Sequence, residues 1–220
     1  MRRQGSYTVG LDLGQANDYS ALAVVERVQV LPPGLTVEDY TYMIRPELVD
    51  LTEEVRVVHL QRWDLGTPYH VVVADVCALM RTPELGSAIL SVDATGVGRA
   101  VMDLFREQYL TGRMGAWPPQ PVTITGGETS VGTSVTKRDL MAALLLPVQQ
   151  DRLRVAAGLA LGEMLERELV SFRMKLTAAG RDSYDVQRRE GEGHGDLVIA
   201  VALAARRPNT TMTTGVLEAI

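Results

Sequence analysis

The sequence predicts an α/β protein with a mixed central sheet flanked by helices, and two observations support this fold class. Apolar runs with the two-residue period of strands come first in the chain, and later strands alternate with helical segments. Residues 196–205 (DLVIAVALAA) are apolar nearly all round, which is typical of a helix buried inside a fold. The chain has 220 residues, 46% of them hydrophobic, so it can bury a substantial core as one domain.

The chain begins as a meander of strands. The pattern indicates strands over residues 7–12, 20–31 and 39–45, and residues 55–63 are either a fourth strand or the end of a longer meander. The first two are expected to pair as a hairpin. LPPGL, at residues 31–35, is a turn that separates the second strand from the third.

A helix and a buried strand follow the meander. Residues 68–81 fit a helix with Pro68 near its first turn, where proline is tolerated. AILSVD, residues 88–93, predicts a buried strand that stops at Asp93, and residues 97–110 predict the next helix.

Strand and helix signals continue to alternate in the second half of the chain. PVTIT, residues 121–125, predicts a short strand that leads into a polar, glycine-rich loop. Residues 137–151 predict a helix that is interrupted or ended near Pro147, and a further helix covers about residues 159–168.

One segment before the last helix is expected to lie outside this pattern. Residues 170–188 alternate like a short hairpin around AAGRDS. We therefore expect a single domain over residues 1–220, with a small hairpin appendage around residues 170–190.

Composition excludes several classes of protein. Cys77 is the only cysteine and sits in an apolar stretch, so we expect a buried hydrophobe and neither a disulfide nor a zinc site. No apolar run is long enough to span a bilayer. The net charge of −5 argues against a general affinity for nucleic acid. It leaves a nuclease open, because acids in a metal site lower the net charge while basic side chains line a groove elsewhere.

Three acids lie where predicted core elements begin or end. Asp12 ends the first strand, Asp93 ends the strand at residues 88–93, and Asp196 opens the last helix. Burying one ionised carboxylate without a partner is costly, and burying three together costs more. A divalent cation is the simplest way to make such a cluster tolerable. Oxygen ligands without cysteine favour Mg²⁺ or Mn²⁺ over zinc, and two such ions can promote hydrolysis of a phosphodiester.

The segment around Asp12 contains further candidates. Asp18 follows it by six residues and could hold a water at the metal site or accept a hydrogen bond just outside it. Gly10 and Gly14 would let a phosphate backbone approach closely. Each acid also has a purely structural alternative: Asp12, Asp18 and Asp93 as turn residues, and Asp196 as the N-cap of its helix. The combination of acids, not any one of them, predicts the site.

The chain resembles the nuclease domain of phage terminase large subunits, which are DNA-packaging motors, and this family has an RNase H-like fold. The resemblance covers nearly the whole sequence. Four stretches carry it: VGLDLGQANDYSALAVVE (9–26), ILSVDATGVGRAVMDLF (89–105), TSVTKRDLMAALLLPVQQDRLRV (133–155) and the final stretch 168–206, which contains HGDLVIAVALAA. The family usually reads HDDL at the start of its last helix.

The resemblance implies a function and a set of site residues. Asp12, Asp93 and Asp196 would be the catalytic acids that bind two Mg²⁺ or Mn²⁺ ions, with Asp18 as an accessory acid. The implied reaction is metal-dependent cleavage of double-stranded DNA at the start and end of packaging, leaving 3′-hydroxyl and 5′-phosphate ends. The candidates for DNA contact are Lys137, Arg138, Arg188 and Arg189.

The resemblance also implies partners and a location. These are a packaging ATPase, the portal and the small terminase, in the cytoplasm of a bacterial host, with the chain a monomer in isolation. The ATPase domain that precedes the nuclease in this family is absent from the sequence, so we expect either an excised domain or a stand-alone nuclease. Gly195 stands where the family commonly has the first of two acids, which weakens the case for a second metal site.

Other readings compete with the terminase nuclease. One is a different RNase H-like nuclease, such as a Holliday-junction resolvase. A second is a sugar-kinase or actin-like ATPase, whose first phosphate loop is similar to GLDLGQANDYSALAV, but such proteins need two domains of this kind around a nucleotide. A third is a non-catalytic binding module of the packaging machinery, favoured by Gly195 and the acidic pI and opposed by the three intact acids.

Overall fold

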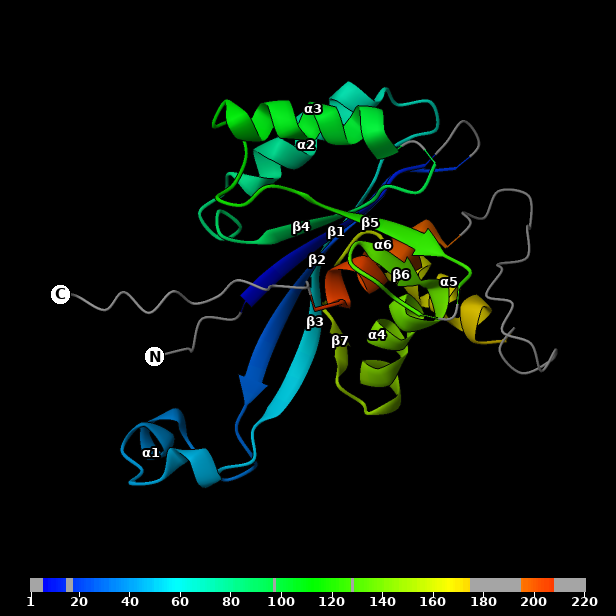
Figure 1. Cartoon of the computed structure of the whole chain (residues 1–220). Helices are drawn as coiled ribbons and strands as arrows, with labels where there is room; N and C mark the ends of the chain where they lie inside the picture. Colours follow the sequence, from blue (N-terminus) through cyan, green and yellow to red (C-terminus); the bar gives the residue numbers. More distant parts are fainter. Residues whose placement is uncertain (1–5, 15–17, 97, 128, 175–194, 208–220) are drawn as a thin grey trace.

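The computed structural model describes residues 6–14, 18–96, 98–127, 129–174 and 195–207, which form a central sheet with helices on both faces (Figure 1). The strands of these residues are β1 (Ser6–Asp12), β2 (Ala21–Val30), β3 (Thr52–Arg62), β4 (Ile89–Asp93), β5 (Gln120–Thr125), β6 (Ser134–Thr136) and β7 (Leu153–Val155). The helices are α1 (Val37–Thr41), α2 (Tyr69–Met80), α3 (Gly98–Leu110), α4 (Lys137–Gln149), α5 (Gly162–Met174) and α6 (Asp196–Ala205), with a 3₁₀ turn η1 (Pro46–Leu48).

The sheet is mixed, as the sequence predicts. Its strand order is β6-β5-β4-β1-β2-β3-β7. β2 pairs antiparallel with β1 and with β3, whereas the other described pairs are parallel. Ala21, at the start of β2, therefore lies opposite both Asp12 at the end of β1 and Arg62 at the end of β3. The carboxyl ends of β1, β3, β4, β5 and β6 meet at this end of the sheet, which we call the carboxyl edge.

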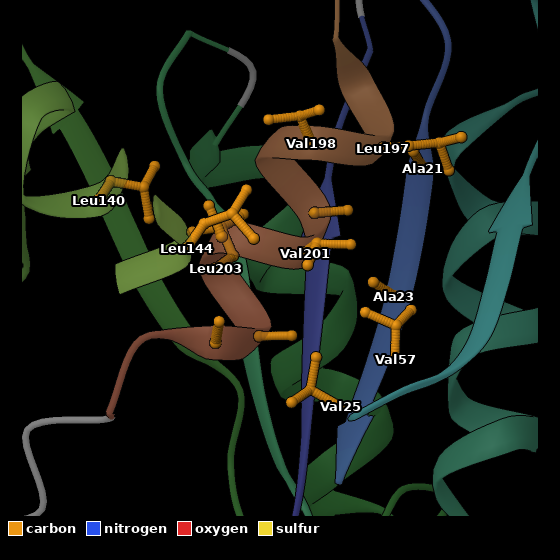
Figure 2. Packing of buried hydrophobic residues seen from close by; sticks show 14 of the residues in the cluster. Ala21, Ala23, Val25, Val57, Leu140, Leu144, Leu197, Val198, Val201 and Leu203 are labelled. Atoms are coloured by element: carbon orange, nitrogen blue, oxygen red, sulfur yellow. The ribbon is translucent and has the colours of Figure 1, made fainter. Parts of the chain in front are cut away.

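Each face of the sheet buries its own core. On one face α2 and α3 cover the alternate apolar residues of β1, β2 and β4 (Figure 1). On the other face α4, α5 and α6 cover β2, β3, β5 and β6. α6 packs on Ala21, Ala23 and Val25 of β2 and against Leu140 and Leu144 of α4 (Figure 2). Because α6 is enclosed by the sheet on one side and by α4 and α5 on the other, the prediction of a helix that is apolar nearly all round is confirmed.

Two glycines near Asp12 make room for the chain itself. A Cβ on Gly10 would lie 2.1 Å from the carbonyl oxygen of Ala200, so this glycine is what allows α6 to lie directly on β1. A Cβ on Gly14 would lie 2.1 Å from the carbonyl oxygen of Asp18. The space above both residues is therefore filled by protein. The expectation that they admit a phosphate backbone is wrong.

The segment between β2 and β3 differs from its prediction. Residues 39–45 were expected as a strand, but the chain forms α1, which starts with a capping box between Thr36 and Asp39. Tyr42 and Ile44 are 80% and 97% exposed, so their alternation has no sheet or core to pack against. The third strand of the chain is instead β3, which includes the predicted residues 55–63 almost entirely. Figure 1 shows α1 at the far tip of the β2–β3 hairpin.

The second half contains more regular structure than predicted. β6 lies inside the expected polar loop, and β7 precedes α5. α4 continues through Pro147 to Gln149. α5 reaches Met174, so residues 170–174 are helical and the expected hairpin is wrong there. The rest of that predicted appendage, residues 175–190, lies outside the described residues.

Two further expectations concern burial and membranes. Cys77 lies in the core against α3, and burial raises the pKa of its thiol to about 11, as expected for an inert small hydrophobe. No helix in the part of the chain that the structure describes is long and apolar enough to cross a membrane.

Candidate functional site

The structure places the three predicted acids at the carboxyl edge. Leu11 and Val92 are register partners in the parallel pair β1–β4, so Asp12 and Asp93 leave the sheet side by side. The contact of Gly10 with Ala200 and the 2.6 Å hydrogen bond from Thr8 Oγ1 to the carbonyl oxygen of Ala204 show that α6 runs antiparallel to β1. The start of α6, Asp196, therefore lies where β1 ends.

The electrostatics of Asp12 show that these carboxylates share one region. The pKa of Asp12 is raised well above its usual value, first by burial and then by the negative charges of Asp93, Asp196, Asp18 and Glu168. Four acids from four different parts of the chain thus act on the same carboxyl group. The metal-free cluster is a repulsive one, which is the electrostatic condition for binding a cation.

Asp93 is held by the turn that follows β4. The backbone N–H of Thr95 donates to Asp93 Oδ1 at 2.8 Å, and Thr95 Oγ1 accepts a 2.8 Å hydrogen bond from the N–H of Ile124 on β5. Burial raises the pKa of Asp93, and the hydrogen bonds from Thr95 oppose that rise. Asp93 is therefore a turn residue, which was the structural alternative considered for it. The same turn orients its carboxylate beside Asp12.

Asp196 is not the N-cap of α6. The N-cap is Gly195, which has φ = 86° in the left-handed region, and Asp196 is the first helical residue. Asp196 is only 4% exposed. The left-handed conformation explains the glycine at position 195, because an aspartate there would be strained.

Glu168 is the acid that sequence reasoning missed. It lies on α5, is 9% exposed, and its Oε2 accepts a 3.2 Å hydrogen bond from the N–H of Val198 on α6. Burial and the charge of Asp196 raise its pKa to about 7, whereas hydrogen bonds from the N–H groups of Val198 and Leu197 and the charge of Arg62 oppose the rise. The available signal was its position three residues after the buried Leu165, on the apolar face of the helix.

The donor chemistry of this cluster fits a hard divalent cation. All its side chains are carboxylates, without histidine or cysteine, which is the set that Mg²⁺ and Mn²⁺ prefer. Glu168 Oε1 is buried and has no hydrogen-bond partner among the described residues. As they stand, no three His, Cys, Asp or Glu side chains of the described residues are grouped closely enough to enclose a metal ion. The cluster therefore has the ligand chemistry of a metal site but not its closed geometry.

A small pocket adjoins the cluster on the side of Asp18. It has a volume of about 240 Å³, and Asp18, Asp64 and Thr67 contribute to its lining. The hydroxyl of Tyr69 donates to the carbonyl oxygen of Gly14 at 2.8 Å, which ties the start of α2 to the loop after β1. Asp18 thus lines this pocket and also raises the pKa of Asp12 by its negative charge.

The structure describes two of the four residues that were predicted to contact DNA. Lys137 and Arg138 open α4, directly after β6, and so lie at the carboxyl edge. Arg188 and Arg189 lie outside the described residues. Arg62 is a further cation at this edge that the sequence did not single out, and its guanidinium lies 4.1 Å from the centre of the Tyr19 ring.

The fold is similar to that of several solved nucleases of large terminases. The large terminase nuclease from thermophilic phage G20c is 22% identical, with 92% of this chain and 82% of that chain covered and a TM-score of 0.53. The structure of the same nuclease with bound magnesium is 23% identical, with 93% of this chain and 82% of that chain covered and a TM-score of 0.52. The Thermus phage P74-26 large terminase nuclease domain is 22% identical, with 92% of this chain and 80% of that chain covered and a TM-score of 0.51.

These matches establish the fold. They confirm the predicted RNase H-like α/β class, and the chain shares the architecture of large terminase nuclease domains over almost all of its length. No protein-family model and no curated protein sequence matches the chain.

Proposed function

We propose that this chain is a metal-dependent endonuclease that cuts double-stranded phage DNA during genome packaging. The observation that supports this best is the meeting of Asp12, Asp93 and Asp196 at the carboxyl edge of a fold shared with large terminase nucleases. One of those nucleases is described with bound magnesium.

In this proposal Asp12, Asp93 and Asp196 hold the divalent cations and Asp18 is an accessory acid. When bound, Mg²⁺ or Mn²⁺ activates a water and stabilises the leaving oxygen of the phosphodiester. The protein contributes the placement of its carboxylates. Thr95 orients Asp93, and the enclosed helix α6 holds Asp196 over the end of β1. The burial that raises the pKa of Asp12 also strengthens the attraction of its carboxylate for a cation.

DNA would approach the carboxyl edge where α4 begins with two cationic residues. Lys137 and Arg138 are proposed to contact phosphates there. Arg188 and Arg189, which lie outside the described residues, are proposed to contact DNA as well. A packaging ATPase, the portal and the small terminase would be the partners, and the bacterial host cytoplasm the location. We also propose that residues 1–220 act as one domain and that the isolated chain is a monomer.

Cleavage of supercoiled plasmid tests the proposal directly. The purified protein is incubated with Mn²⁺, Mg²⁺ or EDTA beside two variants, Asp93→Asn and Asp103→Asn. Asparagine at position 93 can still accept the hydrogen bond from Thr95 but loses the charge. Asp103 is exposed on α3, so its variant is a control for the same chemical change. We expect nicking and linearisation that need metal, persist in Asp103→Asn and are lost in Asp93→Asn.

Two results would redirect the proposal. Folded protein that cleaves in none of these conditions would favour a binding module of the packaging machinery. Cleavage confined to a four-way DNA junction, with plasmid left intact, would favour a resolvase of the same fold class.

A further inference from the structure

Glu168 contacts α6 from a different helix. The first N–H groups of a helix have no partner inside that helix, and they carry partial positive charge. At the start of α6 they are met by Glu168 Oε2, which accepts from the N–H of Val198 at 3.2 Å. A side chain of α5 therefore anchors the end of α6 that carries Asp196.

The second carboxylate oxygen of Glu168, Oε1, does not contribute to this helix cap. Oε1 is buried and has no hydrogen-bond partner among the described residues, and the whole residue is 9% exposed. Leaving a carboxylate oxygen buried and unpartnered is costly. The partial positive charge at the start of α6 favours a carboxylate in this cap, but the cap uses only one of its two oxygens and leaves Oε1 buried without a partner among the described residues.

The start of α6 also lacks a second carboxylate of its own. Position 195 is a glycine in a left-handed conformation, so α6 presents Asp196 as the one acid of its first turn. Glu168 lies at the same helix end, and its charge acts on both Asp196 and Asp12. Glu168 therefore supplies a second carboxylate at the start of α6, from a different helix.

We propose that Glu168 is a ligand of the metal site, with one carboxylate oxygen anchoring the start of α6 and the other available to a cation shared with Asp12 and Asp196. This inference rests on the proposed metal-dependent function. It gives the chain a fourth metal-binding acid, supplied by α5, in place of an acid at position 195.

Mn²⁺ binding, measured by titration calorimetry without DNA, tests the proposal. The wild-type protein is compared with Glu168→Gln, which keeps the acceptor for Val198 and removes the charge. Glu166→Gln is the matched control, because Glu166 lies on the same helix but is exposed. We expect Glu166→Gln to bind like wild type and Glu168→Gln to bind roughly 10- to 100-fold more weakly, with an unchanged circular dichroism spectrum.

Each outcome decides a different point. Wild-type affinity in folded Glu168→Gln would overturn the inference, leave Glu168 as a helix anchor only and leave the nuclease proposal intact. A wild-type protein that binds no Mn²⁺ would overturn both. Should Glu168→Gln not fold, Glu168→Asp decides instead. Its carboxylate is one methylene shorter and cannot serve both Val198 and a cation, so undiminished affinity would again overturn the inference.

Discussion

Replacing Glu168 with glutamine removes an ionisable group whose pKa the fold raises from 4.5 to about 7. The folded protein keeps this proton up to a higher pH than the unfolded chain does. Glu168 therefore costs no stability below pH 4.5, costs progressively more as the pH rises toward about 7, and has its full cost above that. The change in pKa corresponds to about 3 kcal/mol, and the variant avoids this loss.

Urea unfolding in EDTA, followed by circular dichroism, measures this cost. Wild type, Glu168→Gln and the control Glu166→Gln are compared from pH 4.5 to about pH 8. Burial also raises the pKa values of Asp12 and Asp93, so all three proteins lose stability as the pH rises. The difference between the curves of wild type and Glu168→Gln reports Glu168 together with its charge coupling to Asp12 and Asp196. We expect Glu168→Gln to gain on wild type by about 3 kcal/mol across this range. A difference that does not change with pH would refute the reasoning.

Three other predictions concern packing and metal. Gly10→Ala should lower the free energy of unfolding by about 3 kcal/mol or more, because its Cβ would meet the backbone of α6, whereas Gly126→Ala, with open space around it, should leave urea unfolding unchanged. Leu203→Ala should cost about 2–5 kcal/mol in the same assay because Leu203 is fully buried; a smaller loss would contradict the packing described for α6. Mn²⁺ at about pH 8 should raise the melting temperature of wild type more than that of Asp12→Asn, measured by scanning calorimetry; equal rises would argue against a metal ligand at Asp12.

The elements that sequence predicted well are those whose burial leaves a periodic pattern. The ends of β1 and β4 at Asp12 and Asp93 and the start of α6 at Asp196 were predicted correctly, because each element is apolar along its length and is bounded by an acid. Those ends determine the candidate site, so the site followed from the same pattern. The parallel register of β1 and β4 and the direction of α6 then bring the acids together.

The elements that sequence missed depend on single contacts. α1 begins with the capping box of Thr36 and Asp39, a two-residue signal that the alternation of exposed aromatic and aliphatic residues obscured. β6 and β7 have three residues each, too few to show a period. Glu168 was expected only as the end of a helix. Its role was missed because its partner, the N–H of Val198, is 30 residues away in the chain and leaves no local pattern.

The enclosure of α6 between the sheet and α4 sets an order on the assembly of the acidic cluster. Asp12 lies on β1, whereas Asp196 belongs to the last described helix, which follows β1 by more than 180 residues in the chain. Until that helix is made, the small residues Gly10, Ala21 and Ala23 border an open groove, and Asp196 is missing from the acids around Asp12. The acidic cluster around Asp12 is therefore incomplete until α6 has been made and has docked. Any cleavage activity would begin only when the last helix docks, once the rest of the sheet has formed.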